Sequence, residues 1–195
     1  EINYRRFFDI NELGAIRMEN PGIFRETHRL IFQMIREGKV TGLRVDHPDG
    51  LYDPVEYFHL LQRNCFLQIH TGPDGPLNNE KEILEQYDAL LSGDRQYKPF
   101  YIVGEKILIR GERMPDDWPI FSTTGYVFLN TVNGIFVDTA SAKAFEEIYE
   151  RFMRVRLNFQ EIVYEKKKLI MEVAMSSEIN MLGIIWTAYP RRTGI

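Results

Sequence analysis

The sequence is poor in the features that mark membrane proteins, disulfide-bonded secreted proteins and nucleic-acid-binding proteins. Cys65 is its only cysteine, so no intrachain disulfide can form, which fits a reducing compartment such as the cytoplasm. No apolar run approaches the roughly 18 residues that a bilayer-spanning segment needs. The net charge of -4 lacks the basic excess on which phosphate binding relies. We therefore expect a cytoplasmic protein whose partner is neither a membrane nor nucleic acid.

The start of the sequence lacks an initiator methionine and the pattern of a signal peptide. We therefore expect these residues to come from the middle of a longer chain or to follow a processed segment. The composition that is present is ordinary for a globular protein, with 44% hydrophobic and 27% charged residues among 195. A chain of this length can bury one large core.

Helical periodicity and strand-like runs alternate along the first half of the sequence. Apolar residues at helical spacing predict helices over 21–38, from 53 to just before 72, and over 80–91. Short apolar runs bounded by turn-forming residues predict buried parallel strands at 39–46 and 100–103. This order of elements predicts an α/β fold.

The second half of the sequence has a different character. Turn-forming residues around aromatic side chains predict a long loop over 107–138 that lies near a functional site. Apolar spacing then predicts a helix that begins at Ser141 and a longer helix over 159–182. We accordingly expect the chain to divide into residues 1–110 and a loop and helical subdomain at 111–195.

An acidic residue stands at the end of each predicted strand. Asp46 ends the first strand and Glu105 follows the second. Parallel α/β barrels place their catalytic groups at the carboxyl ends of strands. Glycosidases use two carboxyl groups there, one as nucleophile and one as general acid/base. A separation of about 5 to 5.5 Å suits a retaining reaction, and about 6.5 to 9.5 Å suits inversion. The pair therefore predicts chemistry at a glycosidic bond.

The residues beside the two carboxyl groups have functional and structural interpretations. Arg44 lies two positions before Asp46, so both side chains share one face of a strand, and the guanidinium would keep the carboxylate ionised. His47 could donate a hydrogen bond to a sugar hydroxyl. Spacing alone instead favours a structural ion pair between Arg44 and Asp46, with Glu105 as a surface residue that pairs with Lys106.

Aromatic side chains near the predicted strand ends could stack on pyranose rings. Aromatic residues at such places more often belong to the hydrophobic core, so both interpretations stay open at this point. The aromatic candidates for stacking are Tyr52, Trp118, Tyr126 and Phe128.

Several separate motifs resemble one family of enzymes. TGLRVDHPDGLYDP at 41–54 resembles the nucleophile region of the alpha-amylase clan of (β/α)8 glycoside hydrolases and transglycosidases, and IVGEKIL at 102–108 resembles its acid/base region. Further similarity covers INYRRFFDINEL at 2–13, DWPIFSTTGYVFLN at 117–130 and VNGIFVD at 132–138. Over residues 1–182 the chain thus resembles the maltooligosyl trehalose synthase family of this clan.

The resemblance implies roles for individual residues. Asp46 matches the nucleophile, Glu105 the general acid/base, and Arg44 the arginine that pairs with the nucleophile. His47 matches a position that lines the site of the donor sugar. The remaining contacts expected with a maltooligosaccharide substrate are Lys106, Trp118 and Tyr126.

The reaction implied by the resemblance is an intramolecular transglycosylation without metal or organic cofactor. It converts the reducing-end α-1,4 linkage of a maltooligosaccharide to an α,α-1,1 linkage. The implied fold is part of a (β/α)8 TIM barrel at residues 1–110, followed by a mostly helical insertion. The third-strand motif and the third catalytic carboxylate of the clan are expected outside residues 1–195. The chain is therefore expected to be an internal fragment that could be inactive alone.

Other functions fit parts of the same pattern. One is another retaining α-glucan hydrolase or transglycosidase of the same clan. A catalytically inactive glucan-binding fragment is a further alternative. A lyase-type barrel would instead use a divalent metal held by oxygen and imidazole ligands. The ligands in that case would be Asp46, His47, Asp49 and Glu105.

Overall fold

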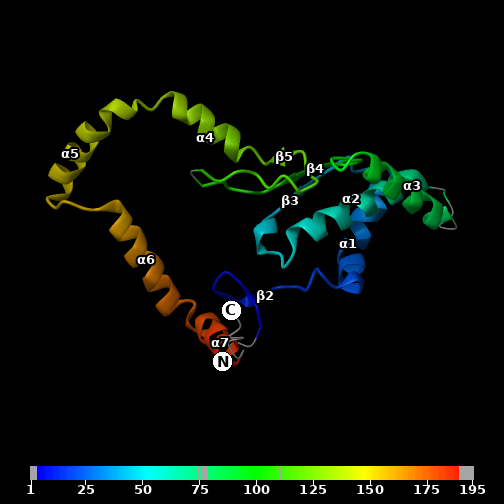
Figure 1. The fold of residues 1–195 in the computed structure, drawn as a ribbon, viewed down its shortest axis with the longest axis horizontal. Coiled ribbons are helices and arrows are strands. Elements are labelled where there is room, and N and C mark those ends of the chain that lie inside the picture. Colours follow the sequence, from blue (N-terminus) through cyan, green and yellow to red (C-terminus); the bar gives the residue numbers. More distant parts are fainter. Residues whose placement is uncertain (1–3, 74, 76–78, 110, 189–195) are drawn as a thin grey trace, which may run out of the picture. The chain divides into compact units, whose positions relative to one another are not determined.

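The computed structural model describes residues 4–73, 75, 79–109 and 111–188 (Figure 1). The fold is mixed α/β and mostly helical, which confirms the predicted class. Its contacts define two compact units, Ile16–Phe136 and a unit that combines Glu1–Ala15 with Val137–Ile195. The subdomain predicted at 111–195 contributes to both units. Its boundary with a barrel at residues 1–110 stays a prediction.

A parallel sheet forms the centre of the unit Ile16–Phe136. In the part of this unit that the structure describes, the strands lie in the order β3 (Gly42–Val45), β4 (Tyr101–Gly104) and β5 (Ser122–Thr123). The ladder between β3 and β4 runs in parallel register from Gly42 with Tyr101 to Val45 with Gly104. The two predicted strands and their parallel direction are therefore confirmed.

The predicted helices of this unit are confirmed and are named α1 (Pro21–Arg36), α2 (Pro54–Thr71) and α3 (Glu80–Gly93). Prolines occupy the first turn of α1 and α2, where no backbone N–H is needed. The Asp53 carboxylate accepts a hydrogen bond from the Glu56 N–H at 2.9 Å and so caps α2. Local capping chemistry thus sets where these helices begin.

The hydrophobic core lies between the sheet and the helices α1 and α2. Burial of each large apolar side chain contributes about 1.5 to 3 kcal/mol, so this cluster is a main source of stability. Its buried members are Phe24, Phe32, Ile35, Phe58, Leu61, Cys65, Phe100, Ile102, Trp118 and Ile120.

Gln62 on α2 joins this helix to the backbone of the sheet. Its side chain is fully buried, and its Nε2 donates to the carbonyl oxygens of Phe100 at 3.0 Å and Pro119 at 2.8 Å. Its Oε1 accepts from the Phe100 N–H at 3.0 Å. The amide therefore satisfies backbone groups just before β4 and β5 that would otherwise be buried without partners.

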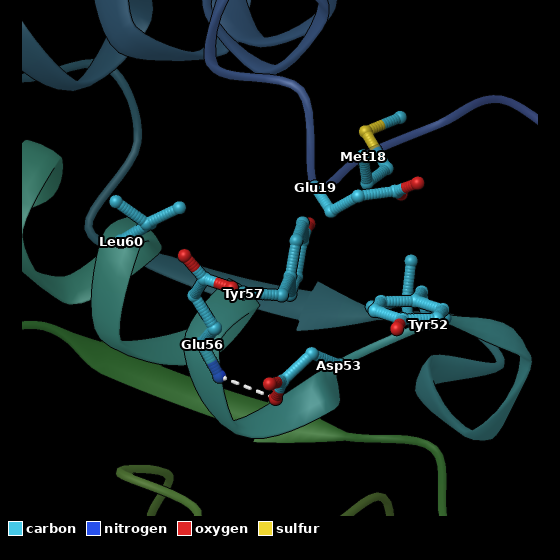
Figure 2. A pocket seen from close by; sticks show the side chains of 8 residues that line it. Met18, Glu19, Tyr52, Asp53, Glu56, Tyr57 and Leu60 are labelled. Atoms are coloured by element: carbon cyan, nitrogen blue, oxygen red, sulfur yellow. Dashed lines mark hydrogen bonds between the residues drawn. The ribbon is translucent and has the colours of Figure 1, made fainter.

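A small cavity lies where α2 begins (Figure 2). Its volume is about 10 Å³, and its lining includes Met18, Tyr52, Asp53, Glu56 and Tyr57. A cavity of this size holds about one water molecule. It is too small for a sugar ring and is separate from the two strand-end carboxyl groups.

The long loop predicted over 107–138 is wrong in part, because β5 and the helix α4 (Tyr126–Ile135) lie within it. Gly125 precedes α4 with a φ of 100°, a left-handed conformation that glycine adopts without strain. A strand of two residues shows no alternation, and α4 has no buried residue that would impose a periodic apolar face. The sequence pattern therefore carried little signal for either element.

The other unit contains a hairpin of β1 (Arg6–Phe7) and β2 (Ile10–Gly14). It also contains the short turn η3 (Thr139–Ser141) and the helices α5 (Ala142–Met153), α6 (Phe159–Val173) and α7 (Ser176–Ala188). The helix predicted from Ser141 is confirmed. The single helix predicted over 159–182 is wrong, because α6 and α7 meet at 82°. Within the described ranges no single helix suffices to cross a membrane, although this bent pair reaches the required length and composition together.

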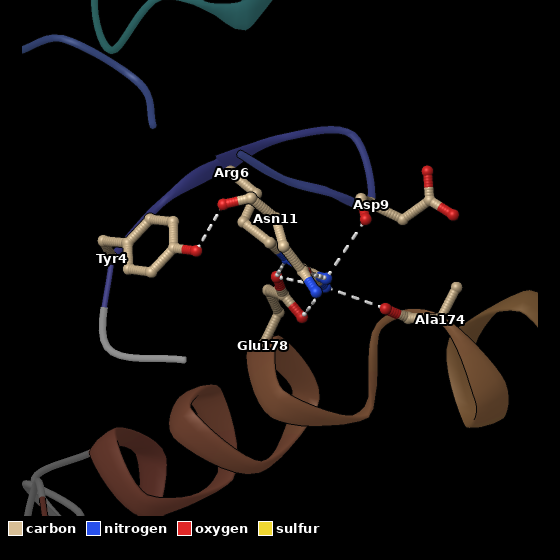
Figure 3. Close-up of polar contacts among 6 residues, drawn as sticks. All are labelled: Tyr4, Arg6, Asp9, Asn11, Ala174 and Glu178. Atoms are coloured by element: carbon tan, nitrogen blue, oxygen red, sulfur yellow. Dashed lines mark hydrogen bonds and ion pairs between the residues drawn. The ribbon is translucent and has the colours of Figure 1, made fainter. Parts of the chain in front are cut away.

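Arg6 fixes the junction between α6 and α7 (Figure 3). Its side chain is only 6% exposed, and the guanidinium donates to both carboxylate oxygens of Glu178 at 2.8 and 2.9 Å. It also donates to the Ala174 carbonyl, at the end of α6, and to the Asn11 side chain, both at 2.8 Å. A bidentate pair of this kind is geometrically specific. The hairpin thereby holds the bend that replaces the predicted long helix.

Candidate active site

The register of the sheet brings Asp46 and Glu105 together. They directly follow Val45 and Gly104, which are partners in the parallel ladder. The Glu105 N–H donates to the Val45 carbonyl at 2.8 Å, so the pairing continues to the residues that carry the carboxyl groups. Both side chains therefore leave the sheet at the carboxyl end of neighbouring parallel strands, which is the position predicted for a catalytic pair.

Asp46 lies in the more open of the two positions, with 69% of its side chain exposed. A hydrogen bond from the Glu105 carboxyl and a second from Arg44 lower the pKa of Asp46. The Arg44 Nη1 donates to the Asp46 Oδ1 at 2.7 Å. The lowered pKa favours the ionised form of the Asp46 carboxyl group. The arrangement thus supplies a charged carboxylate at Asp46.

Glu105 is held by donors from three parts of the unit and is 21% exposed. The Arg44 Nη2 lies 3.3 Å from its Oε1, and the Tyr126 hydroxyl donates to the same oxygen at 3.2 Å. The His47 backbone N–H donates to Oε2 at 3.2 Å. Arg44 therefore contacts both carboxyl groups, while Tyr126 at the start of α4 orients the Glu105 side chain.

His47 begins a tight turn in the left-handed backbone region, with a φ of 49°. The turn η1 (Pro48–Gly50) follows, and the Gly50 N–H donates to the His47 carbonyl at 3.1 Å. A side chain at position 50 would approach the imidazole, because a Cβ there would lie 3.0 Å from its Cδ2. A non-glycine residue with positive φ is often found where a site fixes its geometry.

Lys106 follows Glu105 but contacts other groups. Its Nζ lies 2.7 Å from the Glu112 Oε1 and 3.2 Å from the Asp49 Oδ2, and its side chain is 13% exposed. The hydrogen bond to Glu112, together with a second to Asp49, raises the pKa of Lys106. Its charge is therefore balanced by protein carboxylates.

Trp118 does not join the other predicted site residues. Its indole is 6% exposed in the hydrophobic core, and its ring centroid lies 5.1 Å from that of Phe58. This position does not favour stacking of Trp118 on a sugar, because its aromatic surface is buried against protein, and the expected contact stays a prediction. Tyr52 and Phe128, by contrast, are largely exposed.

The alternative of a divalent metal site receives no support from the side-chain positions. Asp49 contacts the Lys106 ammonium, and Glu105 contacts Arg44, Tyr126 and His47. Among the residues that the structure describes, no group of three or more His, Cys, Asp and Glu side chains could hold a metal ion. The four proposed ligands therefore do not form a metal-binding cluster.

Sequence reasoning missed two features of this site. The first is the hydrogen bond from Tyr126 to Glu105, which joins segments 21 residues apart. The second is Glu112, which accepts from both Lys106 and the Ile109 N–H. Neither contact has a spacing signature, because each depends on how the loops after β4 and β5 fold back.

Comparisons with known proteins place the site in context. No protein-family model matches the chain. A protein from two strains of Mycobacterium tuberculosis, provisionally named maltooligosyl trehalose synthase, is 32% identical over 135 residues, 69% of this chain. This chain spans only 14% of the length of that relative.

Solved structures give matches over a larger part of this chain. A glycosyltrehalose synthase designated DSM5389 is 34% identical, with a TM-score of 0.71 over 94% of this chain and 20% of its own length. The maltooligosyltrehalose synthase of Arthrobacter ramosus is also 34% identical, with a TM-score of 0.69 over 92% of this chain and 20% of its own.

Proposed function

We propose that this chain, a homologue of part of the maltooligosyl trehalose synthases, carries the nucleophile and the general acid/base of an intramolecular transglycosylation. The enzyme would be an isomerase that converts the reducing-end α-1,4 linkage of a maltooligosaccharide to an α,α-1,1 linkage. The observation that carries the proposal is that Arg44 contacts both Asp46 and Glu105, which follow paired residues of two parallel strands. The parent fold is a (β/α)8 barrel to which β3, β4 and their helices contribute.

The first step forms a covalent glycosyl-enzyme. An Asp46 oxygen attacks C1 of the sugar on the non-reducing side of the last linkage, and the bond from C1 to the glycosidic oxygen breaks. Glu105 gives its proton to that oxygen, which becomes the 4-hydroxyl of the released glucose. The lowered pKa of Asp46 supplies the charged nucleophile that this step needs. Arg44 orients the attacking carboxylate through its contact at 2.7 Å.

The second step returns the released glucose to the same carbon. Glu105, now a carboxylate, accepts the proton of the anomeric hydroxyl of the glucose. The anomeric oxygen attacks C1 and displaces Asp46, so that an α,α-1,1 linkage forms. Two successive inversions at C1 retain the α configuration. Reactant and product have the same composition, as an isomerase requires.

The contact of one guanidinium with both carboxyl groups favours this double displacement over inversion. An inverting enzyme keeps its carboxyl groups about 6.5 to 9.5 Å apart to accommodate a water molecule. Here the Arg44 guanidinium contacts both groups, at 2.7 Å from Asp46 and 3.3 Å from Glu105. The geometry therefore supports Asp46 as a nucleophile rather than as a base that activates water.

Product analysis tests the proposal in the intact protein that carries this sequence. With maltopentaose, we expect loss of reducing ends and a trehalose-terminated pentasaccharide, and we expect Asp46→Asn and Glu105→Gln to abolish both. Shorter maltooligosaccharides with new reducing ends would instead identify a hydrolase of the same clan. Turnover near the wild-type rate in either variant would overturn the assigned roles.

A further inference from the structure

We infer that Lys106 is a positioning residue that ties the turn after β3 to the loop after β4 and so fixes the spacing of Asp46 and Glu105. This inference rests on the proposed function. It assigns Lys106 no contact with the sugar, in contrast to the substrate contact expected from the sequence. The ammonium is linked instead to one carboxylate from each of the two loops.

The contacts of the ammonium carry the inference. Asp49 lies in η1, three residues after Asp46, and its Oδ2 is 3.2 Å from the Lys106 Nζ. Glu112 lies in the loop after β4, and its Oε1 is 2.7 Å from the same nitrogen. Lysine side chains are usually exposed, yet this one is only 13% exposed. The two contacts use two of its three donors and leave little of the charge for a ligand.

The Glu112 carboxylate is bound to the backbone of its own loop, and Asp49 lies in a hydrogen-bonded turn. The Glu112 Oε2 accepts a hydrogen bond from the Ile109 N–H at 3.0 Å, a contact within the same loop. Asp49 belongs to a turn that is closed by the hydrogen bond from Gly50 to the His47 carbonyl. The contacts of Lys106 with Asp49 and Glu112 therefore connect η1 to a side chain that is bound to the Ile109 backbone.

The tie acts where the proposed reaction is most sensitive to position. His47 is held in the left-handed region, and its N–H donates to the Glu105 carboxyl at 3.2 Å. Asp46 directly precedes this turn and is largely exposed, so its position depends on the turn as well as on its contact with Arg44. Release of η1 would move Asp46 and weaken the hydrogen bond from His47 to the acid.

Kinetics of three variants with maltopentaose test the inference. Lys106→Met should lower kcat by about 10- to 100-fold, the effect of misplacing a reacting group by about 1 Å, and leave KM within about twofold of wild type. Lys106→Arg keeps a cation that can reach both carboxylates and should restore most of kcat. Lys81→Met is the matched control, because Lys81 is 89% exposed and pairs with Glu85 at 3.7 Å on α3. It should not change either constant.

A double-mutant cycle separates the tie from a general loss of charge. Glu112→Gln should reproduce the pattern of Lys106→Met, and the double variant should be no slower than the worse single variant. Additive losses would overturn the inference. A higher KM with unchanged kcat would also overturn it, because that result identifies a direct contact with the glucan.

Amide hydrogen exchange provides a readout that does not depend on turnover. Lys106→Met should speed exchange in residues 47–51 and at Ile109 without a general loss of protection. Unchanged exchange in both loops would overturn the tie even if the protein forms trehalose-terminated product. Absence of that product in the wild type would overturn the proposed function, while the exchange experiment still decides whether Lys106 joins the loops.

Discussion

Arg44 contacts Asp46 and Glu105 at the same time, through Nη1 at 2.7 Å and Nη2 at 3.3 Å. The contact is possible because Arg44 pairs with Val103 in the ladder, two residues before Glu105 on the neighbouring strand. On a strand, residues two positions apart share one face. One cation therefore orients both carboxyl groups, and the positions of the pair depend on the backbone of the two strands that carry them.

Gly104 is the backbone position on which this geometry depends most. A Cβ at residue 104 would lie 3.1 Å from the Ile120 Cδ1 and 3.5 Å from the Phe58 Cζ. We expect Gly104→Ala to destabilise the protein by about 1 to 2 kcal/mol through overpacking, and to slow turnover by displacing Glu105. Chemical denaturation measures the first effect. The control is Gly93→Ala, where a Cβ meets nothing within 4 Å. A loss of stability in both variants alike would contradict this account.

Gln62 should contribute more to stability than an ordinary polar side chain. In Gln62→Leu, the N–H and carbonyl of Phe100 and the carbonyl of Pro119 lose a buried partner. Each such group costs about 1 to 3 kcal/mol, so we expect a loss of about 3 kcal/mol or more in the free energy of unfolding. Gln33→Leu is the control, because it removes one exposed hydrogen bond. It should change the free energy of unfolding by less than about 0.5 kcal/mol. Equal effects of the two substitutions would show that Gln62 is not a structural link.

His28 should make the stability depend on pH. Burial between α1 and α2 lowers its pKa, against the opposing hydrogen bond to the Phe24 carbonyl, and its Nε2 lies 3.0 Å from the Tyr57 hydroxyl. The unfolded chain binds a proton near its ordinary pKa of about 6.5, while the folded protein stays neutral to lower pH. The stability that neutral His28 contributes is therefore fully present above about pH 6.5. Below that pH the free energy of unfolding declines by at most about 1.4 kcal/mol per pH unit.

Denaturation curves between pH 5 and 8 check the sign of this effect. The stability of the wild type relative to His28→Gln should decrease as the pH falls, because glutamine can form hydrogen bonds but does not titrate. A difference between the two proteins that is constant over this range would contradict the prediction.

Features set by neighbouring residues in the sequence were predictable. The helices α1 and α2 begin at capping residues and first-turn prolines that the sequence displays. The alternation of helices and apolar runs likewise predicted the parallel pairing of β3 and β4. Asp46 and Glu105 were identified at the ends of these strands because strand ends are visible in the pattern.

Features set by distant residues were not predictable. The bend between α6 and α7 is held by Arg6, which lies 172 positions before its partner Glu178. In the sequence, a tryptophan in a substrate site cannot be distinguished from one in the hydrophobic core. The packing of Trp118 on Phe58 becomes visible only in the structure. In the sequence, Lys106 resembles a ligand-binding cation because it follows Glu105. In the structure, its ammonium lies 2.7 Å from the Glu112 carboxylate, a contact that depends on how the loop after β4 folds.

Trapping the covalent intermediate tests the central claim most directly. A maltosyl fluoride needs no acid to release its leaving group, so Glu105→Gln should still be glycosylated but should lose the sugar slowly. Mass spectrometry of the protein that carries this sequence should then find a maltosyl adduct on the peptide containing Asp46, and none in Asp46→Asn with Glu105→Gln. An adduct on another residue, or equal labelling when Asp46 is replaced, would contradict the assignment of Asp46 as the nucleophile.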